Sequence, residues 1–207
     1  ALLGTAQTAS EGTVSGADLL VRPMLRIAEM LEVVPGLVAV QHSGSGKANQ
    51  YFLRGFNLDH GTDFLTHIDG VPWNLRSHGH GQGYLDVNGL IPQMIESIDF
   101  RKGPYRADVG DFGMVATSFI NTINELDSSH LSLEVGENGW RKFEGGQSME
   151  LGEGILTTIG EIKTYSGPWE RDEELRQVSV WGKYSKPTDF GSISFSLFGY
   201  DGNWHPT

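Results

Sequence analysis

The segment 76–86, RSHGHGQGYLD, gathers two histidines, a glutamine, a tyrosine and an aspartate around three glycines. His78 and His80 are two positions apart, so in an extended segment both imidazoles point to the same side. Two imidazoles on one side can bind zinc, copper or iron, and Asp86 or a side chain from elsewhere could complete the ligand set. The pair His78 and His80 is therefore a candidate metal site.

The same segment also allows two interpretations without a metal, one structural and one in ligand binding. The glycines allow the chain to turn sharply, and the histidines could then simply hydrogen-bond to neighbouring loops. Alternatively, the segment could recognise an organic ligand, such as a siderophore or a saccharide, by stacking and hydrogen bonding. The residues proposed for such a ligand-binding loop are Trp73, Arg76, His78, His80, Gln82, Tyr84 and Asp86. Residue types alone leave these three interpretations open.

A second cluster of possible metal ligands lies in the segment NLDHGTD, where His60 stands between Asp59 and Asp63. Aspartate and asparagine beside glycine are ordinary turn residues, because their side chains hydrogen-bond to the local backbone. We favour the turn as the interpretation of this segment.

Composition excludes several classes of function. The 26 acidic residues outnumber the 15 basic ones among 207, so a nucleic-acid partner is not expected. The chain has no cysteine and no motif of the form HExxH or GxSxG, so we expect no enzyme and no cofactor. A histidine-dependent metal enzyme stays a weaker alternative. No apolar run approaches the roughly 18 residues of a membrane helix, but a β-barrel wall would escape such a test.

The first half of the chain has the pattern of a mixed α/β unit with many loops. Residues 1–15 are small and polar without a period, which predicts a flexible N-terminal segment. Apolar residues at helical spacing from Met24 to Leu31 predict a helix that ends before Pro35-Gly36. Short apolar runs predict strands over residues 37–40, 50–53, 64–68, 95–100 and 119–123.

The second half, after Asp127, alternates apolar and polar residues with the period of an antiparallel β-meander. Residues 155–165 are less regular, because the apolar residues change phase between Ile159 and Ile162, and we interpret this as a bulge or the start of a loop. The alternation alone fits half of a soluble β-sandwich and the wall of a membrane β-barrel equally well.

The order of four motifs separates these alternatives. They are MLRIAEMLEVVPGLVAV, QYFLRGFN, THIDGVPWN and IPQMIESIDFRKGPYRADVGDFGMVATSFINTINE. Together they resemble the plug domain of TonB-dependent outer-membrane receptors. The resemblance implies an α+β plug domain followed by antiparallel strands of a truncated transmembrane β-barrel. The domains would be the flexible segment 1–15, the plug 16–126 and the first barrel strands 127–207.

The resemblance also implies a function. Such a receptor lies in the Gram-negative outer membrane, among its lipids, and imports a scarce solute when the TonB energy-coupling protein of the inner membrane pulls on the plug. A ferric siderophore or another metal complex is the favoured ligand, met by the loop that contains His78 and His80. Arg54, Arg101 and Lys102 resemble plug cations that make ionic contacts with the barrel. A secreted β-rich ligand-binding module without transport remains the alternative.

The length of the chain is too short for a whole barrel. A plugged transporter of this kind has about 22 strands, whereas the residues after Asp127 suffice for only about four or five strands of the usual length. We therefore expect the chain to be part of a longer receptor.

Overall fold

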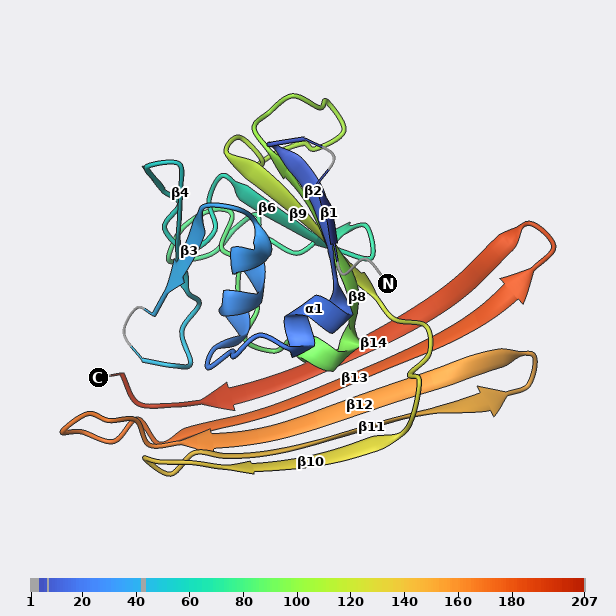
Figure 1. The fold of residues 1–207 in the computed structure, drawn as a ribbon. Helices are drawn as coiled ribbons and strands as arrows, with labels where there is room; N and C mark the ends of the chain where they lie inside the picture. Colours follow the sequence, from blue (N-terminus) through green and yellow to red (C-terminus); the bar gives the residue numbers. More distant parts are fainter. Residues whose placement is uncertain (1–3, 7, 42–43, 207) are drawn as a thin grey trace. The chain divides into compact units, whose positions relative to one another are not determined.

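A computed structural model describes residues 4–6, 8–41 and 44–206, which form two compact units (Figure 1). The first unit contains the described residues up to 41, residues 47–88 and residues 95–122. The second contains residues 44–46, residues 89–94 and the described residues after 122. None of the helices in these ranges is long and apolar enough to cross a membrane.

The first unit is built on a six-stranded sheet in which only β6 and β9 run parallel. Its strands, in spatial order, are β1 (Gly4–Ala6), β2 (Glu11–Ser15), β8 (Ile95–Lys102), β9 (Ala116–Thr122), β6 (Phe64–Ile68) and β7 (Val71–Pro72). A second sheet contains β3 (Leu37–Val40), β4 (Gln50–Leu53) and β5 (Phe56–Asn57). The helices are α1 (Gly16–Leu20) and the 3-10 helix η1 (Ile27–Val33), which ends before Pro35 as expected.

The N-terminal segment differs from the sequence prediction. Residues 4–6 and 11–15 form β1 and β2 rather than a flexible lead-in, and β2 pairs with β8 from Glu11 opposite Arg101 to Ser15 opposite Ser97. The strand EGTVS has little apolar character, so its order comes from backbone hydrogen bonds to a strand more than eighty residues away. Residues 1–3 and 7 lie outside the described part of the chain.

Two motifs of the first unit are tight hairpin turns. Arg54-Gly55 joins β4 to β5, and Asp69-Gly70 joins β6 to β7. All four residues have positive φ, at 54° and 81° in the first turn and 47° and 80° in the second, as type I′ turns require. The Asp69 carboxylate also accepts a 2.8 Å hydrogen bond from the Thr122 N–H, which ties this turn to the end of β9.

The second unit is an antiparallel meander of five long strands in sequence order (Figure 1). They are β10 (His130–Val135), β11 (Arg141–Leu151), β12 (Gly154–Tyr165), β13 (Leu175–Thr188) and β14 (Gly191–Asn203). The short 3-10 helix η2 (Pro92–Met94) also belongs to this unit. The bulge expected in residues 155–165 is wrong, because β12 pairs without a register shift on both sides. The phase changes because Ile159 lies on the same face as Glu161, opposite Trp181.

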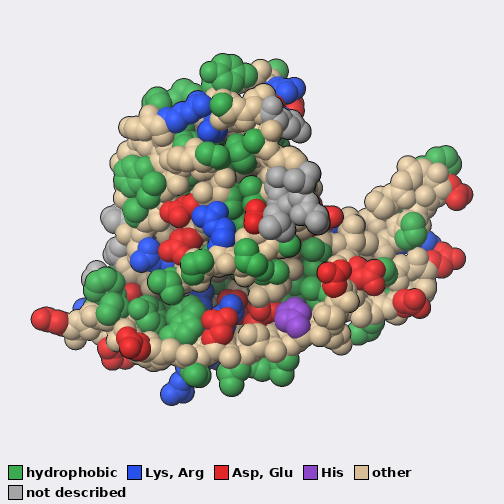
Figure 2. All heavy atoms as spheres, in the orientation of Figure 1, with side chains coloured by type: hydrophobic (Ala, Val, Ile, Leu, Met, Phe, Trp, Pro, Cys, Tyr) green, Lys and Arg blue, Asp and Glu red, His purple; other side chains and the backbone are tan. Residues whose placement is uncertain are grey.

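The two faces of this sheet have opposite character. The pairing aligns Leu133, Phe143, Ile162 and Val178 across four strands, whereas Ser132, Glu144, Glu161 and Ser179 form the adjacent row on the other face. Apolar side chains on one face are exposed, with Leu133 at 73% and Phe195 at 71%. Figure 2 shows hydrophobic side chains, in green, protruding along the lower edge of the molecule. Glu144 and Glu161 are buried.

Charged side chains on the polar face compensate one another. Lys142 lies 3.1 Å from Glu134 and 3.7 Å from Glu161, and Lys163 lies 3.9 Å from Glu161. A soluble sandwich buries its apolar face, whereas this sheet exposes it and buries a compensated polar one. The arrangement matches a barrel wall with lipid outside.

The Asp69-Gly70 turn provides a test of the first unit. A Cβ added at Gly70 meets no atom within 4 Å, so Gly70→Ala should cost about 1 kcal/mol through its φ of 80° alone. Gly79, which has equally open space and no such φ, is the matched control, and Gly79→Ala should change little. Hydrogen exchange of β6 and β9 amides in the intact protein measures both. Equal effects of the two substitutions would contradict a conformational origin.

The exposed apolar face provides a second test. In the intact protein in a bilayer, spin labels on this face should respond to lipid-soluble oxygen more than to an aqueous relaxation agent. The sites are Leu131, Leu133, Val178, Val180, Ile193, Phe195 and Leu197. Labels at Ser132 and Ser194, on the opposite face, should show the reverse preference. Aqueous accessibility at most of the apolar sites would favour the sandwich instead.

Candidate functional site

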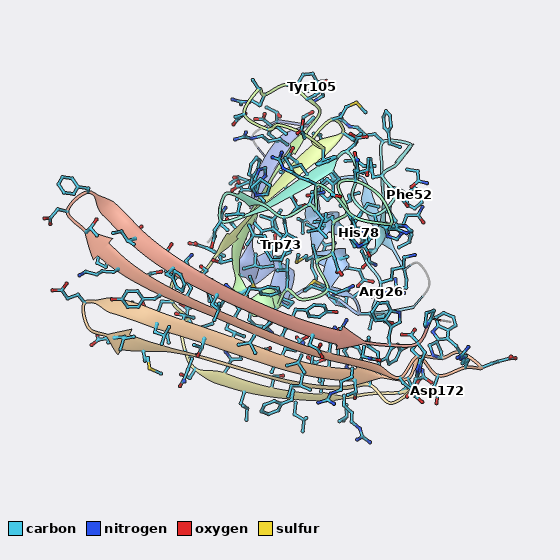
Figure 3. All side chains as sticks on the ribbon, turned by 180° about the vertical axis from the view of Figure 1, so that it is seen from behind. Arg26, Phe52, Trp73, His78, Tyr105 and Asp172 are labelled. Carbon is cyan, nitrogen blue, oxygen red and sulfur yellow. The ribbon has the colours of Figure 1, made fainter. Side chains whose placement is uncertain are left out.

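Residues 75–84, here called the histidine loop, close on themselves directly after β7. The Leu75 N–H donates to the Tyr84 carbonyl at 2.8 Å, and the Gly83 N–H donates to the Leu75 carbonyl at 2.9 Å. Between these ends the side chains of the loop are exposed. Figure 3 labels Trp73 and His78 in this region. The hydrogen-bonded ends of the loop form its base, and the exposed residues between them form its tip.

Asn74 anchors the base of the histidine loop. Its buried amide nitrogen lies 2.8 Å from the Gly83 carbonyl and 3.1 Å from the Gly61 carbonyl, and it also contacts the Phe64 carbonyl at 3.2 Å. Its oxygen accepts from the Thr66 N–H at 2.8 Å. Sequence reasoning did not single out Asn74, because an asparagine after a short strand is indistinguishable from an ordinary turn residue until its partners are known.

The segment that carries the two histidines turns between them, which corrects the expectation of an extended segment. The Gly81 N–H donates to the His78 carbonyl at 3.2 Å, so the chain turns between them. The His78 ring stacks on Tyr84 with centroids 4.0 Å apart and an angle of 19° between planes. The His78 Nδ1 atom accepts from the His80 N–H at 3.2 Å. Glycines at 79 and 81 make such a turn easy.

His80 lies against His60 and, edge-on, against Tyr84. The centroids of the two histidine rings are 4.5 Å apart at 71°, an edge-to-face contact. His60 is buried, and its Nε2 atom lies 3.8 Å from the Asp59 carboxylate. The segment 59–63 is a turn, as we favoured, with φ of 46° at Asp59 and 62° at Asp63. The turn and the loop together bring Asp59, His60 and His80 into one group.

Burial shifts the ionisation of groups around the loop. The pKa of His60 is lowered mainly by burial, although its contact with the Ala48 carbonyl and the charge of Asp59 oppose this shift, so the neutral imidazole is favoured. Burial also raises the pKa of Tyr84 and of Asp86. The Asp86 carboxylate accepts a 2.9 Å bond from the Asn88 N–H, which partly offsets the effect of burial.

The remaining residues proposed for ligand binding divide into exposed and supporting positions. Arg76 and Gln82 are exposed, and the Gln82 carbonyl accepts from the Thr62 hydroxyl at 2.6 Å. Trp73 is half-buried and its indole N–H donates to the Asp86 carbonyl at 2.9 Å. The exposed surface of the loop therefore consists of imidazole, guanidinium and amide groups, and Trp73 connects to Asp86 beneath it. Ligand binding by these residues stays a prediction.

The three cations expected to contact the barrel have different surroundings within the first unit. Arg54 is exposed in the β4–β5 turn, and Arg101 pairs with Asp108 at 3.1 Å. Lys102 is buried, and its ammonium lies 3.4 Å from the Pro35 carbonyl, with its pKa lowered first by burial and then by Arg54. Their ionic contacts with the barrel stay a prediction.

Comparison with solved structures shows the fold of this chain in receptors of low sequence identity. The ferric enterobactin receptor PfeA of Pseudomonas aeruginosa, in a Q482A mutant bound to enterobactin, matches 96% of this chain with a TM-score of 0.70 at 18% identity. FpvA of P. aeruginosa, bound to a heterologous pyoverdine–iron complex, matches 95% with a TM-score of 0.73 at 16% identity. The copper transporter OprC matches 97% with a TM-score of 0.72 at 15% identity.

The chain spans only 34%, 26% and 32% of these three proteins, respectively, about a third of their length or less. The family model of the TonB-dependent receptor plug domain matches residues 5–117, more than half of the chain. This range contains the whole histidine loop and nearly all of the first unit, and the alternating strands follow it. The chain therefore belongs to the TonB-dependent receptor family of the Gram-negative outer membrane, with a plug domain followed by the first antiparallel strands of a truncated β-barrel.

Proposed function

We propose that the intact protein imports a scarce solute across the outer membrane, with a ferric siderophore or another metal complex as the favoured ligand. The observation that carries the proposal is the plug-domain match, followed by a sheet with an exposed apolar face and a buried polar one. The relatives described above support the ligand class, because they include receptors bound to a siderophore and a copper transporter.

The histidine loop is the proposed recognition surface. Its exposed tip offers imidazole rings from His78 and His80, the Arg76 guanidinium and the Gln82 amide. Flat aromatic and imidazole rings can stack on a chelator, and a guanidinium favours the negative charge of many metal chelates. Asn74 fixes the base of the loop through hydrogen bonds to Thr66 and Gly83, so the exposed tip is anchored to the folded unit.

Energy for import would come from the TonB protein of the inner membrane acting on the plug. In this proposal Arg54, Arg101 and Lys102 contribute ionic contacts between plug and barrel that change when the plug is released. Arg54 is exposed and Arg101 is already paired with Asp108, so Arg54 is the cation most available for such a contact.

Uptake by cells tests the function. Deleting the gene should abolish accumulation of at least one radio-iron-labelled siderophore from a panel of catecholates and hydroxamates, and removing TonB from otherwise unaltered cells should have the same effect. Surface binding should persist without TonB. Accumulation that is independent of TonB, or binding without any accumulation in unaltered cells, would support a ligand-binding module without transport.

Substituting the loop histidines tests the recognition surface. Replacing His78 and His80 together by alanine should weaken binding of the transported chelate by roughly tenfold to 100-fold, if each ring contributes about 1 kcal/mol by stacking or hydrogen bonding. Ser77→Ala, an exposed change in the same loop, is the control and should bind as the unaltered protein does. Stability should change by less than about 0.5 kcal/mol, because the side chains are exposed. Unchanged affinity would leave the loop a purely structural element.

A further inference from the structure

The group formed by Asp59, His60 and His80 has the composition of a metal site. Each of the three side chains offers one ligand atom, and these atoms lie within 4.8 Å of one another. We propose that they form a binding site for a divalent transition-metal ion, Zn²⁺ or Cu²⁺, with Nε2 of His60, one ring nitrogen of His80 and a carboxylate oxygen of Asp59 as ligands. Two imidazoles and one carboxylate suit these ions, which favour nitrogen donors.

His60 is already oriented as a metal ligand. Its Nδ1 atom lies 2.8 Å from the Ala48 carbonyl oxygen, and a carbonyl only accepts, so Nδ1 carries the proton and Nε2 carries the lone pair. A ring N–H bound to a backbone carbonyl is the usual way in which proteins orient a metal-bound histidine. The His60 carbonyl also accepts from the Leu85 N–H at 2.6 Å, which fixes the backbone of the ligand.

Asp59 places a negative charge beside that nitrogen. Its carboxylate oxygen lies 3.8 Å from His60 Nε2, and more than half of the side chain is exposed. The residue has a left-handed backbone, with φ of 46°, in the turn that carries His60. Carboxylate and imidazole therefore come from consecutive residues of one turn, while the third ligand comes from the histidine loop.

Closing the site requires a modest movement. Ligand atoms around a tetrahedral zinc ion are about 3.3 Å apart, because each lies about 2.0–2.1 Å from the metal. The separations, at most 4.8 Å, must therefore shorten by up to about 1.5 Å. Most of this movement would come from His80, which is exposed and flanked by two glycines. With three protein ligands, a fourth position stays open for water or a group of an incoming chelate.

His78 does not belong to this group in the part of the chain that the structure describes. It is stacked on Tyr84 and accepts from the backbone of His80. The site therefore differs from the His78–His80 pair expected from sequence. It also does not depend on the proposed transport function, because metal binding needs neither TonB nor an energy source.

Metal titration of the intact protein, purified in detergent, tests the site. Zn²⁺ alone is titrated in competition with a chromophoric chelator, and Cu²⁺ alone is followed by electron paramagnetic resonance, which reports coordinated nitrogens. The unaltered protein should bind one ion with two imidazole nitrogens. His80→Ala and Asp59→Asn should each weaken binding by roughly tenfold to 100-fold or more. Neither should unfold the protein, since both side chains are exposed and asparagine tolerates a left-handed backbone.

Two matched variants serve as controls. His78→Ala removes a neighbouring histidine, and Asp63→Asn removes a neighbouring carboxylate with the same backbone conformation. Both should retain the affinity and the two-nitrogen signal. Absence of stoichiometric binding, binding that persists in His80→Ala, or equal loss in His78→Ala would overturn the site. In those cases the contact between His60 and His80 is aromatic packing only.

Discussion

The side chain of Asn74 is the interaction on which the candidate site depends. Its amide joins the carbonyls of residues 61, 64 and 83 and the N–H of Thr66, so one residue connects the turn after β5, strand β6 and the end of the histidine loop. A buried amide left without these partners would cost several times the net value of one hydrogen bond. Asn74 therefore holds together the two segments that carry His60 and His80.

The second unit follows a different rule. A water-soluble sheet gains stability by burying its apolar face, whereas here Leu133 and Phe195 are exposed and Glu144 and Glu161 are buried. Buried carboxylates are tolerated because Lys142 of β11 and Lys163 of β12 compensate Glu161, and His130 contacts Glu144. The pattern is stable only where lipid covers the outside, which agrees with the family to which the chain belongs.

Much of the fold could be predicted from local patterns. The apolar runs at residues 37–40, 50–53 and 64–68 coincide with β3, β4 and β6, because short buried strands are nearly continuous in apolar residues. Strand β2 could not be found this way, since its polar residues are ordered by β8. The irregular phase of β12 was misinterpreted for a related reason: Ile159 breaks the alternation to pack opposite Trp181, and a single strand does not reveal its partner.

The residue types of the candidate site could be predicted from the sequence, but the contact between His60 and His80 could not. The segment RSHGHGQGYLD indicated an exposed loop with imidazole groups, and the structure places it so. A turn places His80 against His60. That contact depends on hydrogen bonds between segments twenty residues apart in the sequence. Periodicity describes neighbours along one element, so contacts of this kind lie beyond its reach.

Rigid and adaptable parts of the loop are separated by its glycines. His60 is held by the Ala48 and Leu85 backbone, whereas His80 is exposed and stands between Gly79 and Gly81. A movement of His80 would therefore leave intact the hydrogen bonds of Asn74 and the pairing of Leu75 with Tyr84, which lie at the base of the loop. Because such a movement involves only a few exposed residues, the sheet that supports the loop would stay folded.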